Sequence, residues 1–245
     1  MPKGVIKVRL DVMLAARGLA ESREKAQALV LAGEVLVNGV KAQKPGQNVP
    51  PEAELQVLRP PPYVSRGGLK LAAALDHFQI AVAGRTCLDI GASTGGFTDC
   101  LLQRGAARVH IVDVGAGQLD WKLRTDPRVV LHERLNARYL AAADIADPID
   151  LLVCDVSFIS VTLILPALPP LLQSHAELVI LVKPQFEVGR EQIGKGGIVR
   201  DPELHKAACD RIESAVRAMN YNTDIIESPI LGAEGNKEFL LYARH

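Results

Sequence analysis

The pattern of apolar and polar positions divides the chain into two parts. In the first sixty or so residues, apolar residues recur at helical spacing and then in short strand-like runs separated by turn signals. From Val64 onward, short and nearly uniform apolar runs alternate with segments of helix length. These runs are Cys87–Ile90, Val109–Val112, Leu151–Cys154 and Leu178–Val182. Strands that are apolar on both faces are typical of a parallel sheet covered by helices on both sides. We therefore predict an α/β, doubly wound, Rossmann-like sheet for the second part.

The first part is predicted to be a small α+β module. An apolar stripe over Leu10–Leu14 indicates a helix that stops near Gly18, and Ser22 is suited to cap a second helix that ends at Gly33. The dipeptide Asn38–Gly39 between two short apolar runs predicts a hairpin. A third strand is expected in ELQVL, residues 54–58.

A proline-rich stretch, RPPPY at residues 59–63, separates the two parts and favours a stiff, extended link. We expect a first domain at residues 1–59, a linker at 60–64 and a second domain at 65–245. The carboxyl ends of the parallel strands are where such sheets bind ligands. Asp113, Asp155 and Lys183 each follow one of the apolar runs. The sequence therefore predicts a polar site at that edge.

Charge is balanced over the whole chain but not along it. Lys and Arg number 28, as do Asp and Glu, so the total charge indicates neither a strongly basic protein nor an acidic tail. Residues 1–63 nevertheless hold nine Lys or Arg against six Asp or Glu. If this part binds a polyanion such as RNA, the candidate contacts to its phosphates are Arg23, Lys25, Lys41 and Lys44. A solvated basic face would give the same pattern.

Cysteine usage and apolar runs favour a cytoplasmic protein. The four cysteines form no C-x-x-C pair, so neither a zinc site nor a disulfide framework is indicated, and we expect no metal. Lys7, Arg9 and Asp11 interrupt the apolar residues at the start of the chain, which is unlike a signal peptide. Prolines break the longest apolar region, Val156–Leu172, so we expect no membrane span.

A glycine turn follows the first strand of the second part, at Gly91–Gly96. It departs from the G-x-G-x-x-G pattern, so a dinucleotide would lack a glycine contact to its pyrophosphate. Asp113 ends the next strand, 22 residues after Gly91, where its carboxylate can accept hydrogen bonds from ribose hydroxyls. A nucleoside without phosphates best fits this combination of a glycine turn and the Asp113 carboxylate. Alternatively, the glycines only permit tight helix packing and Asp113 is a solvated strand end.

Five motifs in order give the chain a family resemblance. They are SRGGLKL (65–71), CLDIGASTGGFTD (87–99), CDVSFISV (154–161), LVKPQFE (181–187) and GNKEF (235–239). With these five motifs the chain resembles the TlyA family of rRNA 2'-O-ribose methyltransferases, which was historically called hemolysin A. The second part is similar to FtsJ-type RNA methyltransferases, and the first resembles a small RNA-binding domain with an alpha-L motif. The resemblance covers essentially the whole chain.

The resemblance implies a ligand and a set of site residues. The implied cofactor is S-adenosylmethionine, held by Gly91, Ser93 and Gly95, with Asp113 on its ribose and Asn136 near its adenine. The family's catalytic Lys-Asp-Lys-Glu set matches Lys70, Asp155, Lys183 and Glu238. The implied substrate is a cytidine in ribosomal RNA. Because the chain carries no long extension at either end, it resembles the shorter family type, which acts on the large subunit.

A ribose 2'-hydroxyl is a poor nucleophile, so its methylation benefits from a base and from in-line positioning. We expect Lys183 to accept the proton, Lys70 to orient the hydroxyl, and the carboxylates to fix the two lysine heads. A lysine accepts a proton only when neutral. The second lysine and a sulfonium disfavour the charged form of Lys183, whereas Asp155 and Glu238 favour it. Taken singly, each of the four residues is also compatible with an ordinary surface or strand-end charge.

Three functions of other classes compete with this interpretation. A membrane-lytic protein, as the hemolysin name suggests, needs an amphipathic or spanning segment, and the sequence shows neither. A non-catalytic RNA-binding assembly factor would not require the complete Lys-Asp-Lys-Glu set, so the presence of all four residues argues against this alternative. A nicotinamide dehydrogenase is disfavoured by the missing G-x-G-x-x-G pattern.

Overall fold

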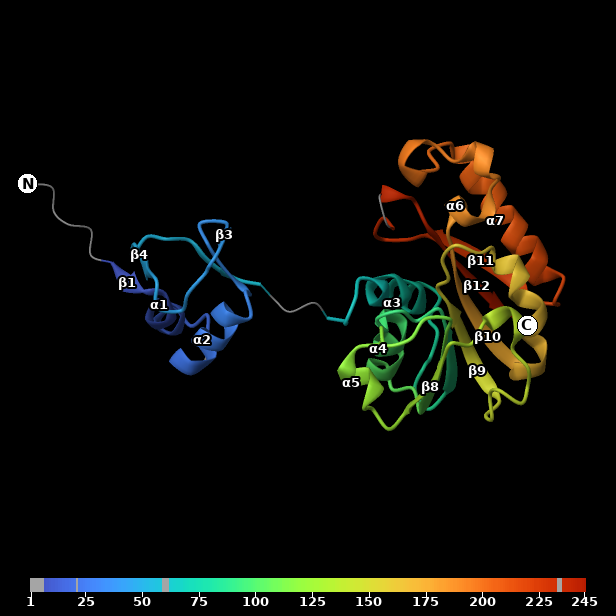
Figure 1. Cartoon of the computed structure of the whole chain (residues 1–245), viewed down its shortest axis with the longest axis horizontal. Helices are drawn as coiled ribbons and strands as arrows, with labels where there is room; N and C mark the ends of the chain where they lie inside the picture. The colour runs from blue at the N-terminus through green and yellow to red at the C-terminus, as the bar shows by residue number, and fades with distance from the viewer. Residues whose placement is uncertain (1–6, 21, 59–61, 233–234) are drawn as a thin grey trace, which may run out of the picture. The chain divides into compact units, whose positions relative to one another are not determined.

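The computed structural model describes residues 7–20, 22–58, 62–232 and 235–245. The chain forms two compact units, Met1–Pro62 and Tyr63–His245 (Figure 1). Part of the expected linker, residues 60 and 61, lies outside the described ranges, as does Arg59. Val64, the last residue of the expected linker, belongs to the second unit, where its backbone N–H donates to Asp99 Oδ2 over 2.8 Å.

Within its described residues, the first unit contains two helices and five very short strands. They are β1 (Val8–Arg9), α1 (Leu10–Ala16), α2 (Arg23–Leu31), β2 (Val35–Val37), β3 (Val40–Lys41), β4 (Asn48–Val49) and β5 (Leu55–Val57). The strands form a three-stranded sheet in the order β3-β2-β5 and a separate β1-β4 pair. Ser22 Oγ accepts the Lys25 N–H over 3.2 Å and so caps α2 as expected. A small apolar core lies between these elements and includes Leu10, Leu14 and Val30.

The second unit is built on a seven-stranded sheet in the order β11-β12-β10-β9-β6-β7-β8. Its strands are β6 (Thr86–Ile90), β7 (Arg108–Asp113), β8 (Val129–Glu133), β9 (Ile149–Cys154), β10 (Leu172–Val182), β11 (Asn222–Glu227) and β12 (Phe239–Arg244). The five strands β6 to β10 are parallel, whereas β12 runs antiparallel to both β10 and β11. The predicted α/β sheet is therefore present, with an antiparallel edge.

Helices cover both faces of this sheet. They are α3 (Gly67–His77), α4 (Gly96–Gln103), α5 (Trp121–Arg124), α6 (Pro184–Glu187) and α7 (Pro202–Arg217), and short 3-10 turns lie at 137–139, 161–171, 190–192 and 195–197. Figure 1 shows α3, α4 and α5 on one side of the sheet and α7 on the other. In the described ranges, no helix is both long and apolar enough to cross a bilayer.

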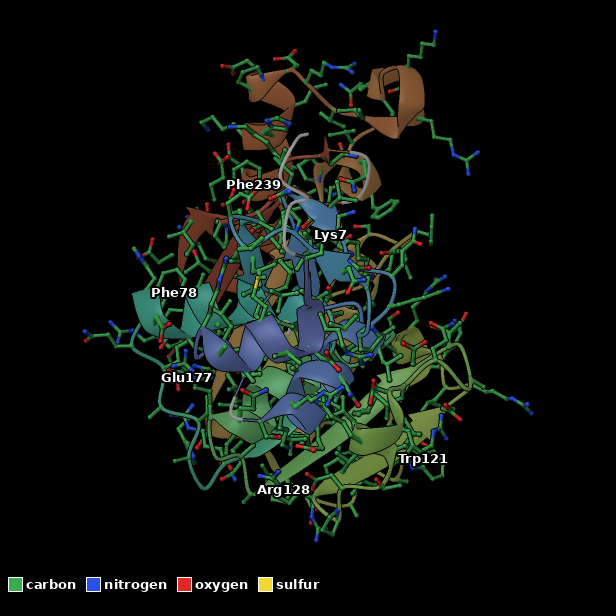
Figure 2. The ribbon with its side chains drawn as sticks, turned by 90° about the vertical axis from the view of Figure 1, so that its left-hand side faces the viewer. Lys7, Phe78, Trp121, Arg128, Glu177 and Phe239 are labelled. Atoms are coloured by element: carbon green, nitrogen blue, oxygen red, sulfur yellow. The ribbon has the colours of Figure 1, made fainter. Side chains whose placement is uncertain are left out.

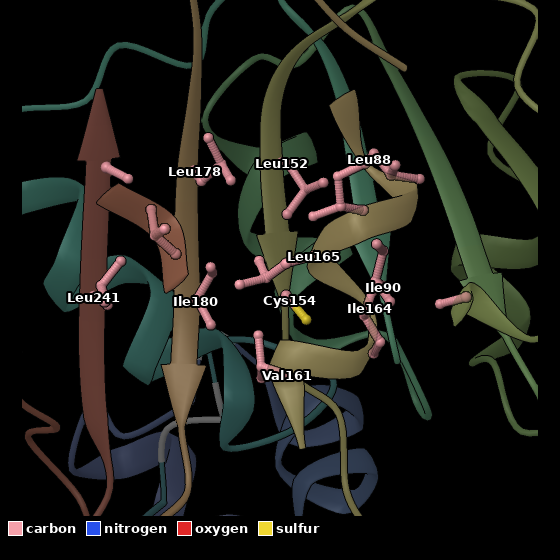
Figure 3. Packing of buried hydrophobic residues seen from close by; sticks show 14 of the residues in the cluster. Leu88, Ile90, Leu152, Cys154, Val161, Ile164, Leu165, Leu178, Ile180 and Leu241 are labelled. Atoms are coloured by element: carbon pink, nitrogen blue, oxygen red, sulfur yellow. The ribbon is translucent and has the colours of Figure 1, made fainter. Parts of the chain in front are cut away.

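Two apolar cores hold these layers together, one on each face of the sheet. Figure 3 shows part of one core, in which Leu88, Leu152 and Ile180 pack beside the turns that contain Ile164 and Leu165. The other core packs α3 and α4 against the opposite face. At its rim Phe78, labelled in Figure 2, stacks on Tyr242 of β12 with ring centroids 4.9 Å apart. The central strands β6, β9 and β10 thus contribute alternate side chains to the two cores, as expected for a doubly wound sheet.

Three strands, β8, β11 and β12, were not among the expected apolar runs, and the first two of these are only partly buried. All five residues of β8 are only half-buried, and β11 alternates exposed with half-buried positions. Strands β8 and β11 lie at the edges of the sheet, where one side has no neighbouring strand. Edge strands tolerate polar residues, so their sequences lack the uniform apolar signature of the central strands.

The turn after β6 depends on glycine. Gly91 adopts a φ of +82°, and a side chain there would place its Cβ 2.6 Å from the backbone oxygen of Asp155. Gly95 has a φ of +98° and begins α4, with Leu119 and Leu123 packed against it. Both positions favour a residue without a side chain. The close approach of Gly91 to Asp155 brings the end of β6 against the end of β9.

Candidate active site at the carboxyl edge of the sheet

Two lysine–carboxylate pairs, one buried and one partly buried, form the centre of the candidate site. Lys70 on α3 is paired with Glu238, and both groups are almost fully buried. Lys183 lies with its Nζ 2.5 Å from Asp155 Oδ1 and 2.9 Å from Ser157 Oγ. The contact with Asp155 has the distance of an ion pair but no aligned hydrogen bond, since Asp155 Oδ1 has no hydrogen-bond donor. The structure thus brings all four predicted catalytic residues into two ion pairs.

The topology of the sheet explains how these residues meet. Lys183 and Asp155 directly follow the neighbouring parallel strands β10 and β9, so both emerge at the same edge. Glu238 directly precedes β12, whose Phe239 is opposite Val182 in the antiparallel register. The antiparallel strand therefore returns Glu238 to the edge where Lys183 emerges, and α3 supplies Lys70 from one face.

Three adjoining cavities surround the two pairs. The first, of about 300 Å³, lies along the glycine turn; its polar lining includes Ser65, Arg66, Lys70, Asp89, Ser93 and Thr94. The second, of about 460 Å³, combines polar Asp113, Gln118 and Asn136 with apolar Ile90, Val112, Leu135 and Ile164. The third, of about 380 Å³, is lined by Lys70, Phe158, Lys183, Gln185, Phe186 and Glu238. Volumes of this size are typical of small-molecule sites.

The residues expected to hold the cofactor fall mostly on the first two cavities. Gly91 and Ser93 line both cavities, and Asp113 and Asn136 line the second. Gly95 lines neither one, because it turns into α4 against Leu119 and Leu123. Its place in the structure indicates a role in shaping the turn rather than in direct contact.

Asp113 organises the glycine turn as well as facing the second cavity. Its two carboxylate oxygens accept the backbone N–H groups of Ser93 and Gly115, each over 2.8 Å. A carboxylate has about four acceptor positions, so this leaves capacity for ribose hydroxyls. Asn136 also bonds locally, since its side chain accepts the Arg138 N–H over 3.1 Å.

Unpartnered buried oxygens single out the same region. In the described ranges, three buried side-chain oxygens lack a hydrogen-bond donor: Asp89 Oδ1, Asp155 Oδ1 and Gln185 Oε1. All three residues line the cavities of the site. A buried polar atom without a partner is costly and uncommon in native proteins, and functional sites are where such atoms are tolerated. Their grouping supports a binding role for this edge of the sheet.

Asp89 is a site residue that sequence reasoning missed. It lies in the middle of β6, has no exposed surface and accepts a hydrogen bond from Thr98 Oγ1 over 2.6 Å. Burial raises the pKa of Asp89 to about 7, with smaller contributions from the negative charges of Asp155 and Asp113, while the bond from Thr98 acts in the opposite direction. The sequence does contain a signal for Asp89, namely a carboxylate within the otherwise apolar run LDI (residues 88–90).

Aromatic side chains flank the third cavity. Phe158 is 92% exposed and has a φ of +66°, which is unusual for a bulky residue. Its ring centroid lies 5.2 Å from that of Phe186. An exposed aromatic face held in a strained backbone is typical of ligand-binding loops. Sequence reasoning assigned no role to either ring.

The basic residues expected to contact RNA lie in the first unit. Lys25, Lys41 and Lys44 are exposed, and Arg23 is half-exposed with its Nε 3.0 Å from Asp11 Oδ2. Arg9, which was not among the candidates, binds the same carboxylate through two nitrogens. Asp11 has no exposed surface, and the Arg9 and Arg23 guanidiniums and the Gln27 amide lower its pKa.

Comparison with known proteins agrees with this arrangement. The family model described as FtsJ-like methyltransferase matches residues 63–245, and the S4 domain model matches residues 8–55. A Mycobacterium tuberculosis protein named 16S/23S rRNA (cytidine-2'-O)-methyltransferase TlyA is 47% identical over 241 residues, covering 97% of this chain and 90% of that protein. A Campylobacter jejuni protein named 23S rRNA (cytidine-2'-O)-methyltransferase TlyA is 35% identical over 257 residues, covering 96% and 98%.

A solved structure supports the same grouping. The Streptococcus thermophilus structure that carries the hemolysin name matches this chain with a TM-score of 0.74 at 44% identity. The match covers 98% of this chain and 89% of that one. The expected resemblance is confirmed by these matches, and the chain belongs to the TlyA, or hemolysin A, family, with an FtsJ-like methyltransferase domain preceded by an S4 domain.

Proposed function

We propose that this protein methylates the 2'-hydroxyl of a cytidine in ribosomal RNA, with S-adenosylmethionine as the methyl donor. The observation that carries the proposal is the presence of two lysine–carboxylate contacts, Lys70–Glu238 and Lys183–Asp155, at the junction of three cavities. The names of the two relatives state methylation at the 2'-oxygen of a cytidine in ribosomal RNA for those proteins.

The first two cavities suit S-adenosylmethionine. The second offers an apolar wall for an adenine between Ile90, Val112 and Ile164, and acceptor oxygens on Asp113 for ribose hydroxyls. The first runs from the glycine turn toward Lys70 and Lys183 and has a mainly polar lining, which suits an amino-acid end. When bound, the cofactor supplies an electrophilic methyl group.

The two lysines have different surroundings, which supports different roles. Among the described residues, Lys70 is paired only with Glu238, whereas Lys183 contacts both Asp155 and Ser157. We assign proton acceptance to Lys183, and to Lys70 the task of orienting the hydroxyl by donating a hydrogen bond to it. Asp155 then stabilises the ammonium that forms on Lys183 when the proton arrives.

The third cavity is assigned to the target nucleotide. It adjoins both lysines, so a ribose placed there presents its hydroxyl to Lys183. The rings of Phe158 and Phe186 offer apolar faces on which a nucleobase can stack. A ribose inside a folded RNA helix cannot reach such a recess without local opening, so we expect the target nucleotide to be unstacked.

The S4 domain is assigned to recognition of folded RNA, with Arg9, Arg23, Lys25, Lys41 and Lys44 as phosphate contacts. Both named relatives act on 23S rRNA, and only one of them acts on 16S rRNA as well. We therefore propose large-subunit RNA as the substrate of this protein.

Mass mapping of ribosomal RNA tests the function directly. Purified protein is incubated with S-adenosylmethionine and either 23S or 16S rRNA from cells that lack it, and the RNA is digested to nucleosides. We expect 2'-O-methylcytidine from 23S rRNA. A methylated base would contradict the catalytic assignment, and leakage of liposomes without methylation would favour the membrane-lytic alternative.

A further inference from the structure

Ser157 occupies a unique place among the described residues, since it lines all three cavities of the site. It lies two residues beyond Asp155, on the loop that follows β9, and its side chain is exposed to the cavities. Lys183 lines only the first and third cavities, and Asp155 only the first and second. In the part of the chain that the structure describes, Ser157 is therefore the one residue that lines the spaces assigned to both parts of the cofactor and to the target nucleotide.

The hydroxyl of Ser157 is bonded on one side and open on the other. Lys183 Nζ donates to Ser157 Oγ over 2.9 Å. Within the described ranges, Ser157 Oγ donates no hydrogen bond to another protein group. Ser160, three residues along the same loop, differs because its Oγ is bonded to Glu187 Oε2 over 2.5 Å. A hydroxyl can accept one hydrogen bond while it donates another, so Ser157 retains a free position that faces the cavities.

We propose that Ser157 is a further catalytic residue, which contacts the 2'-oxygen of the target ribose and relays its proton to Lys183. The inference rests on the proposed methyl transfer. The 2'-hydroxyl donates to Ser157 Oγ, and the Ser157 hydroxyl donates to the neutral Nζ of Lys183. Such a chain holds the attacking oxygen in place and connects it to a base that is itself almost fully buried.

The atoms balance in this relay. The oxygen–methyl bond forms as the methyl–sulfur bond breaks, and the sulfonium becomes a neutral thioether. The proton on the 2'-oxygen passes to Ser157 Oγ, whose own proton passes to Lys183 Nζ. Lys183 becomes an ammonium beside Asp155, 2.5 Å away, and the serine ends unchanged.

Single-turnover methylation of 23S rRNA fragments by the full-length protein tests the relay. Ser157→Ala removes the hydroxyl, Ser157→Thr keeps it, and Ser174→Ala is a matched control at an exposed position in β10. We expect Ser157→Ala to lower the rate by about 10–100-fold, at or below the lower end of general acid–base effects, because a water molecule can take the place of the hydroxyl. Ser157→Thr should retain most of the rate, and Ser174→Ala all of it.

The combined variant Ser157→Ala/Lys183→Ala separates a relay from a structural role. If Ser157 acts through Lys183, removing it from a chain that already lacks the lysine should cause no further loss, because residues that act as one unit are not additive. The affinities for S-adenosylmethionine and RNA should be those of the wild type. An additive loss in the combined variant, or a matching loss of cofactor affinity in Ser157→Ala, would overturn the relay.

The failure of the relay and that of the proposed function give different results. A wild-type protein that forms 2'-O-methylcytidine, together with a Ser157→Ala variant of equal rate, would overturn the relay alone. A wild-type protein that forms no 2'-O-methylated nucleoside under any of these conditions would overturn both.

Discussion

The two units of this protein handle charge in opposite ways. In the first, the Arg9 and Arg23 side chains are about half exposed, and a single buried carboxylate, Asp11, anchors them both. In the second, Lys70 and Lys183 are 8% and 9% exposed, and each has its own carboxylate partner. The arginines around Asp11 therefore lie at the surface of the first unit, whereas the two lysines of the candidate active site lie in the wall of a cavity.

The difference shows which task each arrangement suits. Exposed cations attract a polyanion through several weak contacts, each screened by salt and none indispensable. Burying a cation costs desolvation free energy. In an active site this cost is offset by strong electrostatic interactions with one reacting atom at short range. Changes in the first unit should therefore have graded effects that depend on salt, whereas changes in the second should have large effects on the rate.

The largest expected effect is at Lys183. Lys183→Ala should lower the single-turnover rate by about 10²–10⁴-fold with little change in RNA affinity, since a base acts in the transition state. Lys183→Arg keeps the positive charge but cannot lose its proton, so it should be nearly as inactive. Rapid-quench assays with saturating cofactor measure both variants. Recovery of much of the rate by arginine would show that the charge matters and proton transfer does not.

The next largest effect concerns folding stability, to which the buried carboxylates Asp89 and Asp11 should contribute with opposite pH dependences. The folded pKa of Asp89 lies near 7, above its usual value of 3.8, so the contribution of Asp89 to the stability of the second unit should fall as pH rises from about 4 to 7 and then level off. The pKa of Asp11 is lowered instead, so the contribution of Asp11 to the first unit is present above about pH 4 and lost in more acidic solution.

Asp89→Asn tests the first of these signs. The variant should be more stable than the wild type at pH 8, by up to a few kcal/mol, because the buried carboxylate no longer has to ionise. At pH 4 the two proteins should be alike. Urea unfolding of the Tyr63–His245 unit, followed by circular dichroism at both pH values, measures the difference. An equal gain at pH 4 and 8 would mean that the substitution acts through packing rather than ionisation.

Removal of residues 1–62 should have an intermediate effect. We expect RNA binding to weaken by about 100-fold at moderate salt and its salt dependence to flatten, by roughly one in the slope of log K against log salt for each phosphate that is no longer bound. Binding of S-adenosylmethionine should persist. Fluorescence titrations at several salt concentrations measure the slope. An unchanged slope would move the RNA site to the loop after α6, which carries Arg190, Lys195 and Arg200.

The smallest effect is expected at the rim of the second cavity. Asp113→Ala should reduce cofactor affinity by about 1–3 kcal/mol, since ribose hydroxyls and the Ser93 and Gly115 N–H groups would have no acceptor there. Asp224→Ala, at an exposed position in β11, serves as a control. Calorimetry compares the two. Equal affinities would remove Asp113 from the cofactor site.

The features that could be predicted from the sequence are those that depend on neighbouring residues. The central strands and the cap at Ser22 were predictable because apolar runs and capping residues act over a few neighbours. The convergence of Lys70, Asp155, Lys183 and Glu238 was expected from motif resemblance, and chain topology explains it. The contact of Ser157 with Lys183 was not predictable, because it depends on how two loops from different strands pack. For the same reason, the exposed ring of Phe158 gave no signal in the sequence.

The Lys70–Glu238 pair also has a consequence for how the protein matures. The two residues are 168 positions apart, so their contact closes a loop containing most of the second unit. Contacts of such long range form late in folding, since the chain between them must first be ordered. The cavities assigned to the cofactor draw on residues 65–183, which precede β12. Glu238 can meet Lys70 only when β12 is paired with β10, so the chemistry assigned to this pair requires the completed sheet, whereas the lining of the cofactor cavities does not include β12.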